Sequence, residues 1–210
     1  VTTSTVITVT IQAAQAPFKG TVTQIPGRIE AEDFDRGGEG VAYHEANTSG
    51  NQGAATYRTD QVDIETNADG GSGYNIAYIL NGEWLEYTVN VNYPGLYLLD
   101  LRMAADGAGK SIHLEIDGEN VSGAIPIPNT GGWQNWQTFT VMLDNQNFTS
   151  GLKVIRIVFD SDYMNLNWLE LRQATVTGLE DVETESAHIF PNPFTGEGLQ
   201  VKCKGEFKYK

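Results

Sequence analysis

Residues 111–117 read SIHLEID, and apolar and polar side chains alternate strictly along this stretch. In an extended chain, Ile112, Leu114 and Ile116 fall on one side and the polar residues on the other. A period of two predicts a β-strand with one face in a hydrophobic core and the other in water. The stretch ends in an Asp-Gly pair, which predicts a tight turn into a next, antiparallel strand.

The same alternation recurs between glycine- and asparagine-rich turns in the rest of the chain. No stretch of ten or more residues carries an apolar stripe at helical spacing. Many short antiparallel strands predict an all-β fold, namely a β-sandwich of the jelly-roll type. The other inward-facing sets are Tyr87, Val89 and Val91; Phe139, Val141 and Leu143; and Ile155, Ile157 and Phe159.

Shifts in composition divide the 210 residues into four parts. Residues 1–27 are rich in Thr and Val and are interpreted as the end of a preceding domain or a linker. Residues 28–172 contain the alternating strands and are expected to form one module. Residues 173–187 form an acidic linker, and residues 188–210 are too few to bury a core, so they are interpreted as a truncated further module.

Charge and composition exclude several classes of protein. The net charge is −14, and the 13 basic residues are scattered, which argues against a nucleic-acid binder. No apolar run approaches the ~20 residues that a membrane span requires. Cys203 is the single cysteine, so an intrachain disulfide and a cysteine-based zinc site are excluded. The many carboxylates are compatible with Ca²⁺, which prefers oxygen ligands.

A small glycoside hydrolase is the alternative that the acidic residues suggest. Glu115 and Asp117 lie on the solvent face of one predicted strand, which is typical of a solvated edge more than of a catalytic pair. Glu83 and Glu86 are three residues apart on another strand and therefore point to opposite faces. The sequence contains no nucleophile-elbow, zinc-protease or phosphate-binding motif.

The four tryptophans fall into two groups. Trp84, Trp136 and Trp168 lie in or beside predicted strands and are expected to pack in the core. Trp133 follows two glycines in the loop TGGWQNW, where an indole is expected to be exposed, as in recognition sites. An exposed aromatic plane suits a sugar, because the C–H face of a pyranose ring stacks on it while the hydroxyls need polar partners.

Four motifs occur in an order and spacing that resemble the family 6 carbohydrate-binding modules, over roughly residues 28–172. The resemblance is closest to the agarase- and laminarinase-associated type. It implies a β-sandwich jelly roll without catalytic activity that binds polysaccharide in a cleft formed by loops. The motifs are IEAEDF (29–34), NIAYILNGEWLEY (75–87), IPNTGGWQNW (127–136) and MNLNWLEL (164–171).

The resemblance also implies which residues bind the sugar. A Tyr and a Trp of the family sandwich a sugar ring, and these positions fall on Tyr78 and Trp133. An Asn that bonds the hydroxyls falls on Asn165, and the family's Glu is assigned to Glu65 from its spacing to Tyr78. Tyr43, Tyr57 or Tyr163 could narrow this cleft or open a second one.

A structural Ca²⁺ away from the cleft is a further expectation from the family. Glu30 and Glu32 in IEAEDF match the carboxylates that hold it. Asn167 and the backbone carbonyl of Arg58 complete the shell.

The tail HIFPNPF, residues 188–194, resembles the start of a C-terminal sorting domain of the type IX secretion system. Together these resemblances imply a secreted or cell-surface location and a monomeric module within a multidomain enzyme that degrades a plant or algal polysaccharide. The module would keep an attached hydrolase near its substrate. The alternatives are a small glycoside hydrolase that uses Glu115 and Asp117 or Glu83, and a structural spacer or adhesion domain that binds no glycan.

Overall fold

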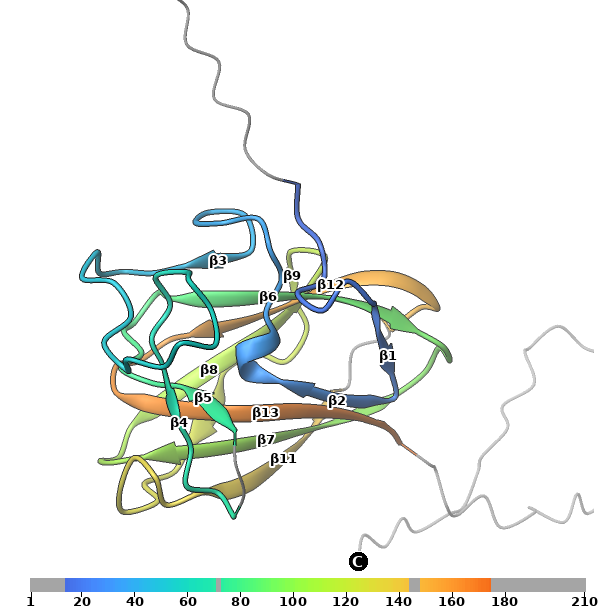
Figure 1. Cartoon of the computed structure of the whole chain (residues 1–210). Coiled ribbons are helices and arrows are strands. Elements are labelled where there is room, and N and C mark those ends of the chain that lie inside the picture. The colour runs from blue at the N-terminus through green and yellow to red at the C-terminus, as the bar shows by residue number, and fades with distance from the viewer. Residues whose placement is uncertain (1–13, 71–72, 144–147, 175–210) are drawn as a thin grey trace, which may run out of the picture. The chain divides into compact units, whose positions relative to one another are not determined.

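Two β-sheets packed face to face make up the part of the chain that the structure, a computed structural model, describes (Figure 1). The described residues are 14–70, 73–143 and 148–174. Apart from one short 3-10 turn, all regular elements are strands. The predicted all-β sandwich is confirmed.

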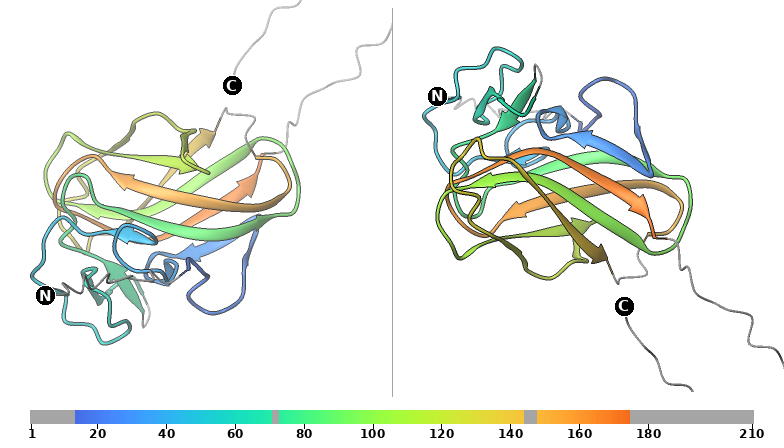
Figure 2. Two further views of the ribbon diagram at one scale, coloured as in Figure 1. Left: turned by 90° about the horizontal axis from the view of Figure 1, so that it is seen from above. Right: turned by 90° about the horizontal axis from the view of Figure 1, so that it is seen from below.

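The first sheet has the spatial order β1-β6-β12-β8-β10, with β3 beside β6 and β9 beside β8. The second has the order β11-β7-β13-β5-β4, with β2 beside β13. The two views of Figure 2 look onto the two sheets in turn. Neighbouring strands are antiparallel, except that β1 runs parallel to β6. The elements are β1 (Thr23–Ile25), β2 (Gly27–Glu30), η1 (Ala31–Asp33), β3 (Tyr43–His44), β4 (Ile64–Thr66), β5 (Tyr74–Ile76), β6 (Trp84–Val91), β7 (Tyr97–Ala105), β8 (Lys110–Ile116), β9 (Glu119–Asn120), β10 (Ile125–Ile127), β11 (Gln137–Leu143), β12 (Gly151–Phe159) and β13 (Met164–Gln173).

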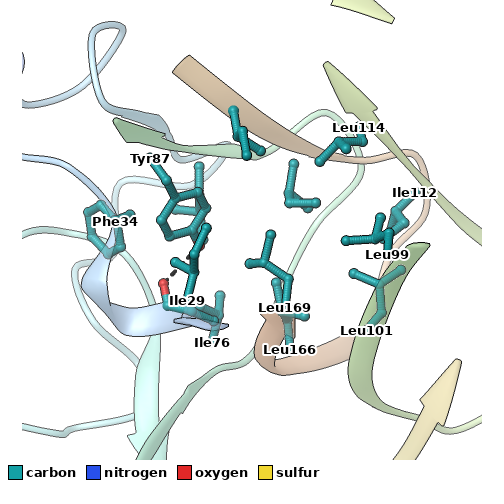
Figure 3. Packing of buried hydrophobic residues seen from close by; sticks show 14 of the residues in the cluster. Ile29, Phe34, Ile76, Tyr87, Leu99, Leu101, Ile112, Leu114, Leu166 and Leu169 are labelled. Atoms are coloured by element: carbon teal, nitrogen blue, oxygen red, sulfur yellow. Dashed lines mark hydrogen bonds between the residues drawn. The ribbon is translucent and has the colours of Figure 1, made fainter. Parts of the chain in front are cut away.

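The core lies between the sheets and consists of the inward residues of the alternating strands (Figure 3). The inward residues predicted on β6, β8 and β12 are all buried. On β11, an edge strand, Leu143 is buried, while Phe139 and Val141 are partly buried against the core. Burial of aliphatic side chains from both sheets is the main stabilising contribution, at about 25 cal/mol per Å² of apolar surface removed from water.

Three tryptophans expected in the core are instead only partly buried. Trp84 and Trp168 lie on the outer faces of β6 and β13, because their neighbours Leu85 and Leu169 point inward. Each indole is covered by an arginine: the guanidinium carbon of Arg156 lies 4.2 Å from the Trp84 ring centroid, and that of Arg28 lies 3.9 Å from that of Trp168. Such cation–π contacts keep an outward indole partly shielded from water. Trp136 is also half-buried, in the loop before β11.

The sandwich begins upstream of Arg28, where we expected the module to start. Ala16 and Arg36 exchange two backbone hydrogen bonds, of 3.0 and 2.7 Å, and β1 pairs with β6. The Arg58 guanidinium also lies 4.1 Å from the Phe18 ring centroid and 3.5 Å from that of Phe34. These contacts between distant segments make residues 14–27 part of the domain, whereas residues 1–13 lie outside the described ones.

The chain leaves the sandwich at the C-terminal end of β13. Here the backbone N–H of Ala174 donates to the carbonyl of Leu96 at 2.9 Å. The predicted acidic linker beyond this point, the expected sorting module at 188–210 and Cys203 lie outside the described residues. No helix in the described part of the chain is long and apolar enough to cross a membrane.

Two glutamates form a buried acidic pair beside β6. Glu45 lies beside Glu83, and burial together with the neighbouring Glu83 raises the pKa of Glu45 well above its ordinary value. Glu83 accepts backbone N–H groups of Leu80 at 2.9 Å and Ala46 at 3.1 Å. Two carboxyl groups this close share one proton more readily than they carry two charges.

We expect Glu45→Gln to stabilise the domain at high pH. Since the folded pKa of Glu45 is raised, the stability that its protonation provides is complete below its unfolded pKa and is lost as pH rises toward the folded pKa. The neutral amide can donate to Glu83 at every pH. Unfolding free energies should favour the variant over the wild type by at least about 1 kcal/mol more at pH 9 than at pH 5, since one pKa unit corresponds to about 1.4 kcal/mol.

The matched control is Glu119→Gln, at an exposed position on β9. It should leave the pH dependence unchanged. An equal effect of Glu45→Gln at both pH values would show that Glu45 does not hold a proton in the folded state.

Candidate functional site

A cavity of about 400 Å³ opens where the loops after β5 and between β10 and β11 meet the start of β13. Its floor lies on β13, where Met164 and Leu166 point into the core and Asn165 points away from it. Its volume lies within the range of small-molecule sites. The cavity brings together all four residues that the family resemblance assigned to sugar binding, and its lining consists of Glu65, Ala77, Tyr78, Trp133, Tyr163 and Asn165.

The polar part of the site is a hydrogen-bonded pair, Asn165 and Glu65. Asn165 Nδ2 donates to Glu65 Oε1 at 2.9 Å and to the carbonyl of Trp133 at 2.7 Å. Asn165 is 3% exposed, so its amide needs these partners. Both donors belong to Nδ2, which leaves the carbonyl oxygen Oδ1 of Asn165 to accept from a ligand.

The first wall is Trp133, in the loop between β10 and β11. Gly131 and Gly132 take φ values of +85° and +154°, which favour glycine, and a Cβ on Gly132 would lie 3.3 Å from Asn135 Nδ2. Thr130 anchors the loop, since its N–H donates to the Ala105 carbonyl at 2.9 Å. The indole of Trp133 remains 54% exposed, as predicted from the sequence.

Two tyrosines form the remaining aromatic part of the lining. Tyr78 follows β5 and is 46% exposed, and Tyr163 precedes β13 and is 57% exposed. Both have left-handed backbones, with φ of +52° and +58°. A non-glycine residue in this region is uncommon, and such strained positions cluster at functional sites. The cavity is therefore apolar at its walls and polar at its floor.

Two residues that the sequence did not single out hold Glu65 in place. Gln134 Nε2 donates to Glu65 Oε1 at 2.6 Å, and Asn75 Nδ2 donates to the same oxygen at 3.2 Å. With Asn165, Glu65 Oε1 thus accepts three amide donors, while Oε2 is left for a ligand. Gln134 Oε1 also accepts the Trp136 indole N–H at 3.0 Å. The fully buried Asn75, in the apolar run NIAYIL, is the one signal that could have pointed to this network.

Of the three tyrosines considered for narrowing the cleft, Tyr163 is the one in its lining. Tyr43 is buried against Phe34, with ring centroids 5.5 Å apart. Tyr57 stacks on Tyr74 at 4.8 Å.

The carboxylates of the hydrolase alternative have other contacts. Glu115 pairs with Arg156 at 3.2 Å, and Asp117 accepts from Lys153 at 2.8 Å. Glu83 is buried with Glu45.

The residues expected to hold Ca²⁺ lie at η1 and the facing part of β13. Glu30 ends β2 opposite Trp168, and Glu32 lies within η1. Glu32 Oε2 is buried without a hydrogen-bond partner, and burial raises the pKa of Glu32 to about 7. A buried, unpartnered carboxylate oxygen suits a cation, so Glu32 fits the role of a Ca²⁺ ligand.

The other two expected ligands fit less directly. Asn167 Oδ1 accepts from Asn67 Nδ2 at 3.0 Å, and its Nδ2 donates to Asp69 at 2.8 Å, so this side chain is already bonded. The Arg58 guanidinium donates to the carbonyl groups of Glu32, Phe34 and Asp35 and so fixes the segment that carries Glu32. The described residues contain no group of three His, Cys, Asp or Glu side chains arranged for a metal, so backbone and amide oxygens would have to contribute.

Comparison with known proteins shows to which family the domain belongs. The family model for carbohydrate binding module (family 6) matches residues 53–173, more than half of the chain. The α subunit of clotting factor G from Tachypleus tridentatus is 30% identical over 125 residues, which are 57% of this chain and 18% of that protein. β-Agarase AgaA from Microbulbifer thermotolerans is 39% identical over 71 residues, which are 33% of this chain and 16% of that protein. The chain thus spans less than a fifth of either relative.

Similar solved structures are binding modules. The module from Cellvibrio mixtus lichenase 5A, in complex with cellotriose, is 30% identical with a TM-score of 0.54, and the match covers 71% of this chain and 98% of that one. A β-1,3-glucan binding module from Bacillus halodurans is 28% identical with a TM-score of 0.53, and the match covers 72% of this chain and 99% of that one. The hydrolase alternative finds no support. The chain belongs to family 6 of the carbohydrate-binding modules and is a non-catalytic domain that binds carbohydrate.

Proposed function

We propose that this module binds a β-linked glucan in the cleft lined by Trp133, Tyr78, Asn165 and Glu65. The observation that carries the proposal is the cavity itself, in which four residues from separate segments of the chain meet. Trp133 and Tyr78 are 54% and 46% exposed, although large aromatic side chains are normally buried to a greater extent. Exposed walls above a polar floor suit a ring that is apolar on its faces and polar at its rim.

The chemistry of the floor supports a neutral ligand with hydroxyl groups. Glu65 is the one charged residue in the lining, and its Oε1 is already engaged by three amide donors. Its Oε2 and Asn165 Oδ1 are two acceptors at fixed positions, which match two neighbouring hydroxyl groups. Stacking at about 1–2 kcal/mol per ring and a few hydrogen bonds at about 1 kcal/mol net each give a Kd of roughly 10⁻³ to 10⁻⁵ M.

The choice of a β-glucan rests on the similar modules of known structure. One holds cellotriose and comes from a lichenase, one binds β-1,3-glucan, and one comes from the marine laminarinase LamC of Zobellia galactanivorans. Agarose is the second candidate, because the β-agarase is 39% identical over the 71 residues that align.

We further infer that the module is monomeric, acts in a secreted multidomain enzyme that degrades polysaccharide, and directs the catalytic part to its substrate. The agarase relative and the family support this role. The HIFPNPF segment supports export by the type IX system. We also propose a structural Ca²⁺ held by Glu30, Glu32, Asn167 and the Arg58 carbonyl, which would neutralise the buried Glu32 oxygen.

Trp133→Ala should weaken polysaccharide binding at least tenfold, because it removes one wall of the cleft. Affinity electrophoresis through gels that contain laminarin, lichenan, xylan, mannan, chitosan or agarose measures this directly. Tyr93→Ala, which removes a tyrosine of 57% exposure outside the cavity lining, is the matched control and should migrate like the wild type. Equal retardation of Trp133→Ala and the wild type would place the binding site elsewhere. Free migration of a folded wild-type chain in every gel would favour the spacer alternative.

Gln134→Leu should weaken binding about three- to tenfold without unfolding the domain. The substitution removes one of the donors that fix Glu65 and the bond to Trp136, while the aromatic walls remain. Gln137→Leu, at an exposed position at the start of β11, is the control. Calorimetric titration gives both affinities, and an unchanged Kd for Gln134→Leu would mean that Glu65 needs no support from this loop.

Ca²⁺ should raise the melting temperature of the domain by several degrees relative to a chelator, since a ligand that binds only the folded state stabilises it. Glu32→Gln should abolish this response, and Glu119→Gln should preserve it. Melting curves that coincide with Ca²⁺ and with chelator would contradict the proposed ion.

A further inference from the structure

Tyr163 occupies a backbone position that a glycine would fill with less strain. Its φ is +58°, a left-handed value that a bulky side chain rarely adopts. The backbone at and before this position is held by hydrogen bonds that do not involve the Tyr163 side chain. The N–H of Tyr163 donates to the Ile79 carbonyl at 2.7 Å, and the carbonyl of Asp162 accepts from Lys110 Nζ at 2.7 Å.

The packing of the fold does not explain the tyrosine either. The side chain is 57% exposed, and the Lys110 ammonium lies 6.0 Å from its ring centroid, at the limit of a cation–π contact. The immediately following residue, Met164, is fully buried and supplies the core contact at this end of β13. The surroundings that remain for the Tyr163 ring are those of the cavity, whose lining it joins.

The strand register shows where Tyr163 lies relative to the two other aromatic walls. Leu166 of β13 pairs with Ile76 of β5. The hydrogen bond from the Tyr163 N–H to the Ile79 carbonyl continues this register to the segment that carries Tyr78. On the other side, Met164 pairs with Ala105, to which Thr130 anchors the Trp133 loop. Tyr163 thus lies between the bases of both walls, two residues along the strand from the floor residue Asn165.

We propose that Tyr163 is a specificity-determining residue, which closes one end of the cleft as a third aromatic wall and restricts it to the terminal sugar of a glucan chain. This inference rests on the proposed function. A cleft open at both ends would let a polysaccharide pass through and bind at many internal positions. A cleft closed at one end accepts a chain only where the chain itself ends.

The test uses Tyr163→Gly, because glycine relieves the left-handed backbone and removes only the wall. Tyr163→Phe keeps the ring and serves as the conservative control. The probes are laminarin and laminarihexaose, or lichenan and a hexasaccharide derived from it if lichenan is the glucan that retards the wild type. Calorimetry gives the affinity and the number of protein molecules bound per glucan chain, and thermal unfolding verifies the fold of each variant.

We expect one wild-type molecule per polysaccharide chain and similar molar affinities for polymer and hexasaccharide. Tyr163→Gly should bind several molecules per polymer chain and lose about threefold or more in affinity for the hexasaccharide, at equal or higher thermal stability. Tyr163→Phe should retain the wild-type stoichiometry.

Two results would overturn the inference: several wild-type molecules per polymer chain, or a stoichiometry and affinity that Tyr163→Gly leaves unchanged. If Trp133→Ala still loses binding in that case, the proposed function stands and only the role of Tyr163 fails. A wild-type chain that binds none of these glucans overturns both proposals.

Discussion

Strand β13 packs against the core on one side and carries buried asparagines on the other, and the cleft depends on the hydrogen bonds of these asparagines. Its inward residues Leu166, Leu169 and Leu171 are fully buried between the sheets. Its outward residues Asn165 and Asn167 are also buried, at 3% and 5% exposure, and their side-chain amides need hydrogen-bond partners. Glu65 of β4 and the Trp133 loop supply the partners of Asn165, and the loop with Asn67 and Asp69 supplies those of Asn167. The Trp133 loop also carries one of the aromatic walls.

The resulting site is stiff before any ligand arrives. The Glu65 carboxylate is held by three amides, and the Trp133 loop is anchored through Thr130 and shaped by two glycines. Binding loses less conformational entropy when the groups that contact the ligand are already fixed. This property matters for a sugar site, because its hydrogen bonds compete with water and leave little free energy to order loops.

Alternation in the sequence was sufficient to predict the sheets, and applied consistently it also places Trp84, whereas a register shift between Leu166 and Trp168 turns Trp168 outward. The run EWLEYTVNV puts Leu85, Tyr87 and Val89 inward and therefore Trp84 outward, as the structure has it. The core assignment was wrong because the general preference of indoles for burial was given more weight than the pattern. The covering arginine, Arg156, lies 72 residues away in sequence, and no local signal connects it to Trp84.

The residues that line the cleft could be predicted from the sequence, but the residues that hold Glu65 in place could not. The motif around Trp133 and the position of Asn165 indicated a sugar site through the resemblance, and the structure brings both into one cavity. The bonds of Gln134 and Asn75 to Glu65 join three segments whose proximity arises from strand pairing, which the sequence does not state. The short β1, with three residues and a proline after it, carried too weak a pattern to mark the start of the domain.

The exit of the chain from β13 determines which way the module can be tethered. Tyr163 directly precedes β13 and Ala174 directly follows it, so the ten residues of this extended strand, Met164–Gln173, separate the cleft from Ala174. At about 3.3 Å per residue, the two points are roughly 30 Å apart. The point at which the chain leaves the sandwich therefore lies at the end of β13 opposite the cleft, away from the surface that a glucan would contact.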